Sequence, residues 1–361
     1  MQNCFLKSLV VANFRNLEHQ KLEFGESNRI LITGQNGAGK TSILEAISLL
    51  SPGRGMRGEK FDNIINTNSS SSTLIFNMQS YIGELQIRVD FTKGPSKKTT
   101  TLNDALIPSN ELIKFSHIFW LTPQQNILFQ EAVSTRRKFF DRIVYSFFSE
   151  HAGNLTKYEH YQKERLHLLT RNEQDGGWVD ILEEKLASIG EEICKSRTSV
   201  LGSLNDMISQ MQNSLPKISL ELKGEMENIY SDNKNDVKEA FRERFKLGRV
   251  KDSVTHKTNF GALKTDFMAR MTQKNLEASL CSTGEQQSCL ISTLIAHTEL
   301  FTTKEQKAPI LLLDELFSHL DEKNKNILSN YLVSKSFQIF ITSTEKELCG
   351  NFSKEALVIE L

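Results

Sequence analysis

The residues best suited to chemistry in this sequence form a glycine-rich loop near the N-terminus. Residues 34–41 read GQNGAGKT and match the phosphate-loop pattern G-x-x-x-x-G-K-[ST] at every fixed position. Glycines let backbone N–H groups face phosphate oxygens, and a following helix adds the positive end of its dipole. We expect Lys40 to reach the β- and γ-phosphates of a nucleotide, ATP or GTP, and Thr41 to bind Mg²⁺. The predicted ATP-binding residues are Gly34, Gln35, Asn36, Gly37, Ala38, Gly39, Lys40 and Thr41.

A pair of acidic residues far along the chain would complete such a site. Residues 310–315 read ILLLDE, in which four apolar residues typical of a buried strand precede Asp314 and Glu315. Asp314 would hold Mg²⁺ directly or through water. Glu315 could polarise an attacking water as a base, so we predict Glu315 and Lys40 as the catalytic residues. Considered alone, the segment could also be a helix cap with ordinary surface acids.

A third segment lies between the loop and the acidic pair. Residues 281–300 begin with CSTGEQ, and apolar residues follow at helical spacing over 290–295. By itself this is a common helix start, with Ser282 as the N-cap and an acid in the first turn. A short SHLD segment, residues 318–321, comes directly after the acidic pair.

The order of these four segments resembles that of ABC-type ATPases. In that class the serine-glycine turn contacts the γ-phosphate of the ATP bound by a partner subunit, again at a helix N-terminus. The resemblance implies an ATP-dependent homodimer that separates when hydrolysis removes the bridging phosphate. It assigns the contact across the dimer to Ser282, Thr283, Gly284, Glu285 and Gln286, and the D-loop to Ser318 and Asp321.

Both ends of the chain carry the strands and helices needed to position these residues. Residues 5–33 alternate like strands up to the glycine loop, and a helical pattern follows at 43–50. The apolar run at 337–343 adds another strand, and a helix is predicted near 321–333. Further strands are predicted at 73–80 and 83–91, which form a hairpin, and at 114–123, whereas 94–101 is predicted as a turn.

In the middle of the chain the spacing of apolar residues changes from strand-like alternation to the period of a helix. Residues 134–215 are rich in Glu, Lys, Arg and Leu at helical spacing, with a break predicted at 175–177, whereas 216–260 favour no single element. The helices of this insertion would reach about 20–40 Å at 1.5 Å per residue. We therefore predict an α/β fold: an ABC-type P-loop ATPase lobe with an inserted, mainly helical lobe and no long coiled coil. The predicted ATPase lobe comprises 1–133 and 290–361, and the predicted helical lobe, 134–289, ends in the signature turn.

The bulk composition limits the partners and the compartment. The chain has 361 residues with 44 Lys and Arg against 44 Asp and Glu, so a polyanion would need a local basic patch. Its 5 cysteines are scattered without a CxxC pair, which indicates reduced thiols rather than a disulfide framework or a zinc site. Without an apolar run of about 18 residues or a signal-peptide pattern, we expect a cytosolic protein with no membrane partner.

Several motifs in one order resemble the RecF family of DNA repair proteins over nearly the whole chain. Residues 6–24 contain the family's F-R-N, 44–58 resemble its L-L-E-A-I and G-R-S-F-R segment, and 121–144 resemble its P-[DE] and R-R-x-F-L-D segment. CSTGEQ and LLLDELFSHLD match its signature and acidic motifs. A transporter ATPase is disfavoured because Thr344 stands where that class has a histidine, and an SMC-type protein because the insertion is too short.

The resemblance implies what such a protein would bind and do. It implies binding to double-stranded DNA next to single-stranded gaps, and cooperation with RecR and RecO in loading RecA. ATP would close a dimeric clamp on duplex DNA, and slow, DNA-stimulated hydrolysis would reset the clamp. Two alternatives stay open: a RecF-like ATPase in another DNA transaction or in defence, and an ATP-dependent recruitment scaffold with negligible turnover.

Two further residues are candidate contacts in the nucleotide site. Arg15, in the F-R-N segment, is a candidate ATP contact. Gln124 replaces the acidic residue that the family usually has after the proline. It joins Thr41 and Asp314 as a candidate contact to Mg²⁺ or to the attacking water.

Candidate DNA contacts come from two basic segments. Arg136, Arg137 and Lys138 form a compact cluster, and residues 241–257 are locally basic with interleaved phenylalanines. Either segment could meet phosphates without reading base sequence. Either could equally be the solvated face of a helix.

Overall fold

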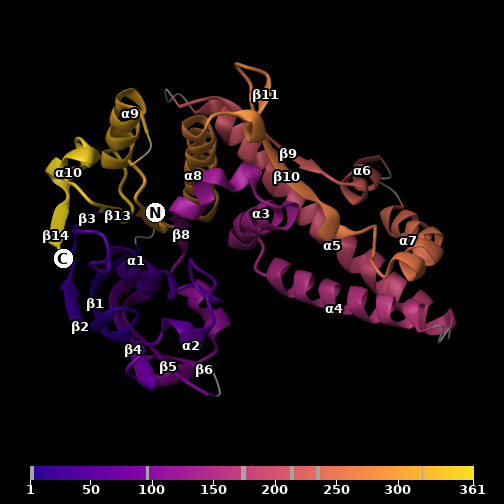
Figure 1. The fold of residues 1–361 in the computed structure, drawn as a ribbon, viewed down its shortest axis with the longest axis horizontal. Coiled ribbons are helices and arrows are strands. Elements are labelled where there is room, and N and C mark those ends of the chain that lie inside the picture. The colour runs from indigo at the N-terminus through magenta and orange to yellow at the C-terminus, as the bar shows by residue number, and fades with distance from the viewer. Residues whose placement is uncertain (1–3, 95–96, 172–175, 212–214, 233–235, 319) are drawn as a thin grey trace. The chain divides into compact units, whose positions relative to one another are not determined.

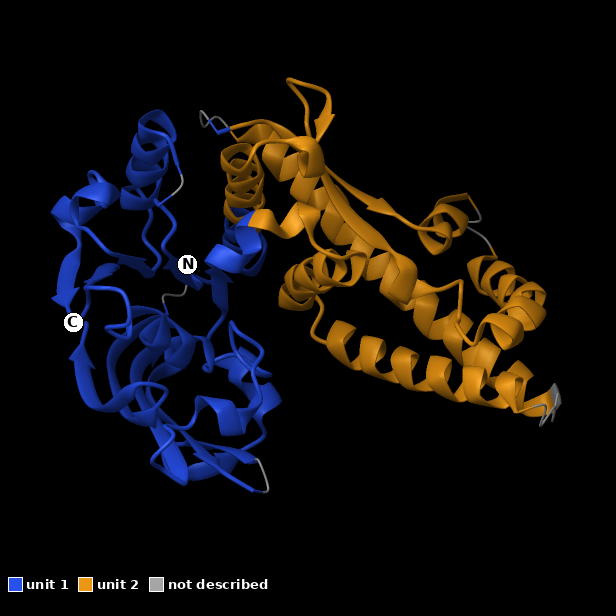
Figure 2. Cartoon of the chain, viewed as in Figure 1, with its two compact units in different colours: residues 1–126, 213–215, 298–361 blue, residues 127–212, 216–297 orange. Residues whose placement is uncertain are grey.

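The computed structural model describes residues 4–94, 97–171, 176–211, 215–232, 236–318 and 320–361. The chain divides into two compact units (Figure 2). Unit 1 comprises residues 1–126, 213–215 and 298–361, and unit 2 comprises 127–212 and 216–297. Two of the junctions fall inside helical segments, the 3₁₀ segment η2 (Pro123–Gln130) and the helix α8 (Thr283–Glu305), so no break in the sequence pattern marks them. The predicted lobe limits at 133 and 290 differ from these unit limits for that reason.

Unit 1 contains a five-stranded sheet, β14-β3-β13-β12-β8, in which every pair of neighbours is parallel (Figure 1). Its strands are β3 (Arg29–Thr33), β8 (Ile118–Leu121), β12 (Ile310–Asp314), β13 (Ile339–Ser343) and β14 (Leu357–Glu360). The runs ILLLD of β12 and IFITS of β13 are buried at every position, as is typical of strands covered on both faces. Because parallel strands end at one edge, the segments that follow β3, β8 and β12 all emerge there.

An antiparallel sheet of six strands, β2-β1-β4-β5-β6-β7, completes the strands of unit 1. These strands are β1 (Phe5–Phe14), β2 (Leu17–Glu23), β4 (Ser71–Ser80), β5 (Gly83–Thr92), β6 (Lys97–Leu102) and β7 (Ala105–Ile107). β4 and β5 form the predicted hairpin, with Ser80 opposite Gly83. The turn predicted at 94–101 is wrong from Lys97 onward, because the β-branched threonines there pair with β5 as strand β6.

One apolar core joins both sheets of unit 1 to helix α1 (Lys40–Ser48). Leu9 of β1, Ile30 of β3 and Leu312 of β12 contribute to it, and Ile43 and Ile47 contribute the apolar side of α1. The glycine loop therefore runs between two elements that the core holds in place. The other helices of unit 1 are α2 (Phe61–Ile64), α9 (Glu322–Val333) and α10 (Phe352–Glu355).

Unit 2 is mainly helical. Its helices are α3 (Val133–Phe147), α4 (His151–Thr170), α5 (Gly176–Gln210), α6 (Glu225–Asp232), α7 (Val237–Thr255) and the part of α8 up to His297. The break predicted at 175–177 is wrong for Gly176 and Gly177, which begin helix α5, and Asp175 lies outside the described residues. With 35 residues, α5 extends about 52 Å, so the expected limit of 20–40 Å is wrong for this helix. No helix in the described ranges is long and apolar enough to cross a membrane.

A small antiparallel sheet, β11-β10-β9, accompanies the helices of unit 2. Its strands are β9 (Ile218–Lys223), β10 (Asp266–Met271) and β11 (Leu276–Glu277). β9 lies in the stretch 216–260 that favoured no single element, and its partner β10 comes only after α6 and α7 in the chain. The pairing of β9 with β10 therefore has no hairpin signal in the local sequence, whereas β10 and β11 are close neighbours in the chain and pair as an antiparallel hairpin.

Candidate active site

The glycine loop turns between β3 and α1 on a backbone conformation that favours glycine. Gly39, the N-cap of α1, has φ 104°, and a Cβ atom there would lie 2.6 Å from Cδ2 of Leu17. Lys40 folds back over the loop, and its Nζ donates hydrogen bonds to the carbonyl oxygens of Gly34 (2.7 Å) and Gln35 (3.0 Å). The lysine charge is therefore held against the loop that precedes it.

Asp314, the last residue of β12, is joined to the start of α1 by a hydrogen bond. Thr41 donates from Oγ1 to Asp314 Oδ1 at 3.1 Å, and Thr342 of β13 donates to the same oxygen at 2.6 Å. Burial raises the pKa of Asp314, and the two threonine hydrogen bonds oppose that rise. A hydroxyl and a carboxylate in contact are hard oxygen donors of the kind that Mg²⁺ prefers, so these residues fit that ion.

Glu315 follows Asp314 with a left-handed backbone angle, φ 49°, which is uncommon outside glycine. Its N–H donates to Thr342 Oγ1 at 3.0 Å, and its carbonyl oxygen accepts from the N–H and the Oγ of Ser318 at 3.2 and 2.8 Å. The unusual backbone is therefore held from both sides. Glu315 lines a cavity of about 370 Å³ together with Asn16, Asn36, Gly37, Gly39, Lys40, Thr41, Ser42 and Arg57.

Three residues of this cavity, Asn16, Ser42 and Arg57, are absent from the predicted site. Asn16 donates from Nδ2 to the carbonyl oxygen of Gly37 at 2.9 Å and accepts from Ser42 Oγ at 2.8 Å, so it ties the loop to α1. Arg57 lines the cavity with its Nη1 3.8 Å from Glu45 Oε2. Asn16 and Arg57 lie in segments that carry the family resemblance, F-R-N and G-R-G-M-R, and that signal could have identified them.

Arg15 is paired inside unit 1. Its Nε and Nη2 donate to the two carboxylate oxygens of Glu45 at 2.9 and 2.6 Å, and its Nη1 donates to the carbonyl oxygen of Asn63 at 3.0 Å. Glu45 lies on α1 and is 1% exposed. Arg15 is therefore the counter-ion of a buried carboxylate, and within the described part of the chain it is not one of the residues that line the cavity.

Gln124 lies just beyond the edge of the parallel sheet where the acidic pair emerges. β8 pairs with β12 with Leu121 opposite Leu313, so Gln124 and Glu315 both follow the carboxyl ends of neighbouring strands. The Gln124 side chain is exposed. A contact to metal or to water stays a prediction for this residue.

The serine-glycine turn in unit 2 closes on itself. Ser282 donates from its N–H and its Oγ to Glu285 Oε2, both at 3.0 Å, which reproduces one half of a capping box. Lys274 forms an ion pair with Glu285, and this contact together with the Ser282 hydrogen bonds lowers the pKa of Glu285 to about 2. The turn thus starts α8 as a capped helix, with Ser282 and Thr283 exposed at its tip.

The segment after the acidic pair leads into helix α9. Asp321 is its N-cap, and Oδ1 of Asp321 accepts the N–H of Asn324 at 2.8 Å. Ser318 and Asp321 are both exposed, whereas His319 lies outside the described residues. Asp321 therefore acts as the N-cap of α9, and its side chain remains exposed to solvent.

The basic cluster at 136–138 is largely paired within unit 2. Arg136 donates from Nε and Nη2 to the two carboxylate oxygens of Asp266, both at 2.7 Å. Arg137 is buried and donates to the carbonyl oxygen of Thr265 at 3.3 Å, and this burial lowers its pKa. Lys138 is exposed. The cluster therefore does not offer three free cations to a polyanion.

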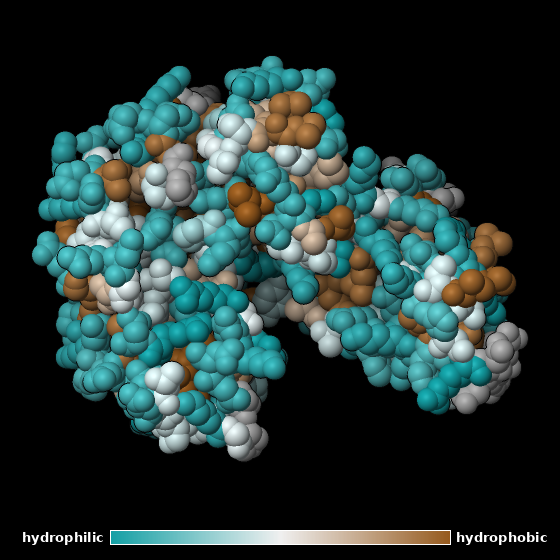
Figure 3. All heavy atoms as spheres, in the orientation of Figure 1, coloured by the Kyte–Doolittle hydropathy of each residue, from teal (hydrophilic) through white to brown (hydrophobic). Residues whose placement is uncertain are grey.

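The second basic segment, residues 241–257, lies mostly on helix α7. Its phenylalanines, Phe241 and Phe245, are core residues of unit 2. The opposite side carries three apolar residues that are 80, 78 and 74% exposed, namely Leu247, Val250 and Val254. Figure 3 shows this apolar surface in brown at the right, where α7 lies in Figure 1. The exposed side of α7 is thus mixed in character rather than a continuous track of cations.

A phosphate loop followed by a buried acid at the edge of a parallel sheet is the core of a nucleoside triphosphatase, and the AAA domain family matches residues 8–347. The DNA replication and repair protein RecF of Rickettsia canadensis (strain McKiel) is 37% identical over 361 residues, which covers 100% of both chains. The chain therefore belongs to the RecF family, as its motifs predicted.

Solved structures support the same fold. The recombination mediator protein RecF-ATPrS in the RecFOR pathway superposes with a TM-score of 0.86 at 25% identity, covering 100% of this chain and 96% of its own. The Smc head domain of Pyrococcus furiosus, bound to the C-terminal domain of ScpA, has a TM-score of 0.55 at 16% identity, covering 99% of this chain and 93% of its own. The second likeness concerns the fold alone. The predicted fold class is confirmed.

Proposed function

We propose that this chain is an ATP-dependent DNA-binding protein of recombinational repair and replication restart, with unit 1 as its ATPase lobe. One observation carries the proposal: Thr41, which closes the phosphate loop, is hydrogen-bonded to the buried carboxylate of Asp314. This pairing is what a Mg²⁺–ATP site requires. Relatives named for DNA replication and repair support DNA as the partner, and the RecF-ATPrS structure supports ATP as the nucleotide.

Each residue of the site has a proposed role. Lys40 would contact the β- and γ-phosphates, and the backbone N–H groups of residues 34–41 would hold the remaining oxygens. Thr41 and Asp314 would hold Mg²⁺, which when bound neutralises charge on the phosphoryl group. Thr342 would keep Asp314 oriented through its 2.6 Å hydrogen bond.

Glu315 would take a proton from the attacking water. Its backbone is fixed by hydrogen bonds to Thr342 and Ser318. The side chain that carries the carboxylate therefore starts from a fixed position in the cavity wall. Gln124, at the end of the neighbouring strand, would help to orient the metal or that water. We propose a weak, DNA-stimulated ATPase, because the site is complete only when a second subunit adds its signature turn.

The proposed dimer uses the exposed tip of the turn at Ser282. Residues 282–286 of one subunit would contact the γ-phosphate held by the other, and the D-loop residues Ser318 and Asp321 would lie beside that contact. ATP would thus close a clamp on duplex DNA next to single-stranded gaps, and hydrolysis would open it. RecR and RecO are the proposed helpers of this clamp in loading RecA.

The test uses a Glu315→Gln variant, which should bind ATP and fail to hydrolyse it. Light scattering should show a monomer with ADP and a dimer with ATP, and a gapped DNA duplex should favour the dimer further. A monomer under every condition would contradict the shared site, and Ser282 would then be a helix cap only. Hydrolysis rates of the unmodified chain with and without duplex DNA address the scaffold alternative, which predicts no stimulation.

A further inference from the structure

Unit 2 contains a pocket whose charged side chains are all basic. It has a volume of about 300 Å³ and lies between α4 and the segments that follow α7. Its walls are formed by Gln162, Lys163, Leu166, His256, Lys257, Thr258, Leu263 and Lys264. Three lysines and a histidine thus converge from three separate segments, with no carboxylate among the residues that line the pocket.

Two of these lysines have no acidic partner in the part of the chain that the structure describes. Lys257 and Lys264 are exposed, and no described carboxylate oxygen lies within ion-pair distance of either amine. Lys163 is shared, because its Nζ lies 2.8 Å from Glu159 Oε1. The pocket therefore carries net positive charge at its mouth, in a chain whose total charge is zero.

A buried hydroxyl in the pocket wall also lacks a partner. Thr258 is 6% exposed, and among the described residues its Oγ1 has no hydrogen-bond partner. Buried hydroxyls are nearly always satisfied, and an unsatisfied one costs free energy. An oxyanion in the pocket would give this hydroxyl the acceptor that it lacks.

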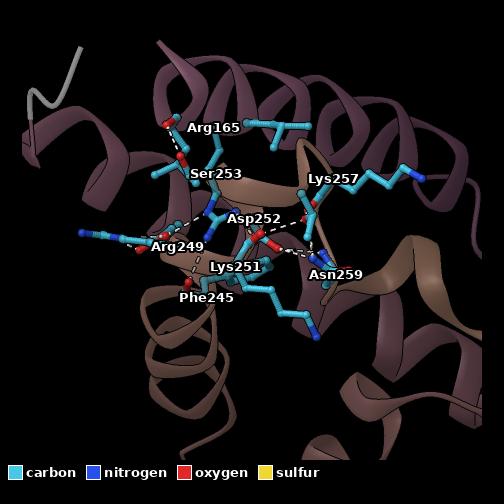
Figure 4. A network of polar contacts seen from close by, with 12 residues as sticks. Arg165, Phe245, Arg249, Lys251, Asp252, Ser253, Lys257 and Asn259 are labelled. Atoms are coloured by element: carbon cyan, nitrogen blue, oxygen red, sulfur yellow. Dashed lines mark hydrogen bonds and ion pairs between the residues drawn. The ribbon is translucent and has the colours of Figure 1, made fainter. Parts of the chain in front are cut away.

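The turn that carries Lys257 and Thr258 is fixed by a partly buried network (Figure 4). Oδ1 of Asp252 accepts the Asn259 N–H at 3.0 Å and its Nδ2 at 2.9 Å, and Asn259 Nδ2 also donates to the carbonyl oxygen of Lys257 at 3.1 Å. Arg165 donates to the other oxygen of Asp252 at 2.8 Å and is fully buried. Figure 4 shows the Lys257 side chain extending away from this network, so its backbone is held while its ammonium stays free.

We propose that this pocket binds a phosphate group of a DNA backbone. Separate lysine ammonium groups recognise phosphate as point charges and carry no base specificity. Leu166 and Leu263 in the walls suit the apolar carbons of a sugar. The proposal deepens the proposed function, on which it rests, and it replaces the paired arginines at 136 and 137 as the source of positive charge for DNA.

A purely structural role for these lysines makes a different prediction. Lys257 lies just past the C-terminus of α7, where a cation offsets the helix dipole. That role would make Lys257→Ala lower the thermal midpoint and would give Lys264 no part in DNA binding. A phosphate pocket makes both lysines matter for DNA while neither matters for folding.

The experiment measures binding of a gapped duplex to the full chain by fluorescence anisotropy, with a slowly hydrolysed ATP analogue, across a salt series. Each phosphate contact contributes about 0.9 to the slope of log affinity against log salt. The Lys257→Ala/Lys264→Ala chain should bind at least about tenfold more weakly at low salt, with a slope smaller by roughly 0.9, the contribution of one phosphate contact. Lys238→Ala, an exposed lysine at the other end of α7, is the matched control and should match the unmodified chain.

Thr258→Val separates binding from folding. It keeps the side-chain shape and removes the unpartnered hydroxyl, so the thermal midpoint should not fall while DNA affinity drops about threefold. If the double lysine variant keeps both the affinity and the salt slope of the unmodified chain, the pocket proposal is overturned and the DNA function stands.

Absence of DNA binding by the unmodified chain would instead overturn the proposed function. Anion binding by the pocket is then tested separately. The change in thermal midpoint on adding inorganic pyrophosphate is measured with a Lys40→Ala chain, whose phosphate loop is disabled. A shift that disappears in the Lys257→Ala/Lys264→Ala background would identify a free phosphate compound as the ligand and would overturn the assignment to DNA. No shift in either background would overturn the anion site altogether.

Discussion

Thr342 donates a 2.6 Å hydrogen bond to Asp314 across the neighbouring strands β13 and β12, where the two residues are register partners. The same hydroxyl accepts the N–H of Glu315 at 3.0 Å. One side chain therefore orients both the proposed metal ligand and the proposed base. Thr342 lies on a strand that is buried at every position, so its hydroxyl holds Asp314 and Glu315 in a fixed orientation.

Removing this hydroxyl should weaken the site and the fold together. Thr342→Val keeps the volume, leaves the Glu315 N–H without its acceptor and removes one of two bonds to Asp314. We expect ATP hydrolysis to fall about 10–100-fold and the free energy of unfolding to fall by about 1–3 kcal/mol. Urea denaturation and a phosphate-release assay measure the two effects, and Thr342→Ser should largely preserve both.

Asp314 should destabilise the protein at neutral pH. Burial raises its folded pKa above the unfolded value of about 3.9, so the folded state binds the proton more tightly. Stability should therefore be lost as the pH rises through the interval between the two pKa values, and the loss should level off above the folded pKa.

Asp314→Asn removes this titration. The variant should be more stable than the unmodified chain at neutral pH, with the difference shrinking towards pH of about 4, where the unfolded carboxyl protonates. Hydrolysis should fall on the order of a hundredfold, because the proposed ligand of Mg²⁺ loses its charge. Urea denaturation across pH checks the stability, and a difference that grows on acidification would contradict the assigned direction.

Two glycines of the loop should differ in their tolerance of alanine. Gly37 has φ 86°, and a Cβ atom there would have no heavy atom within 4 Å, so Gly37→Ala adds backbone strain only, about 1 kcal/mol. Gly39→Ala adds the same strain and a contact of 2.6 Å to Leu17. We expect Gly39→Ala to destabilise the fold by at least about 1 kcal/mol more than Gly37→Ala. Equal melting temperatures for the two variants would contradict this account.

Substitutions at Arg15 can distinguish a structural role, as the counter-ion of Glu45, from direct contact with the nucleotide. Arg15→Ala leaves the buried Glu45 without its bidentate partner and should lower the free energy of unfolding by about 3 kcal/mol. The double variant Arg15→Met/Glu45→Leu replaces the pair with apolar side chains and should recover most of that loss.

ATP affinity of the double variant then decides the role of Arg15. If Arg15 acts only as the counter-ion of Glu45, the stable double variant binds ATP like the unmodified chain. A stable double variant that has lost ATP affinity would show that Arg15 contacts the nucleotide, as the family resemblance predicted. Fluorescent ATP analogue titration gives the affinity, and chemical denaturation confirms that the chain is folded.

Local physics made much of this protein predictable from its sequence. The glycine loop, its following helix and the buried strand before Asp314 each follow from residue types within a few positions of one another. The hairpin at Ser80 and Gly83 and the helix that begins after Asp321 are local in the same sense. The threonine-rich strand at 97–102 was missed because turn residues precede it and its partner decides its state.

Only the tertiary structure decided which distant side chains meet. Thr342 and Asp314 are 28 residues apart, and Arg136 and Asp266 are 130 residues apart. Neither contact can therefore be predicted from the spacing of residue types within one segment. The second contact pairs an arginine that was predicted to bind DNA with a carboxylate inside unit 2. The lysines at 163, 257 and 264 line one pocket for the same reason. Periodicity shows which face of an element is buried, whereas packing of the whole chain selects what that face meets.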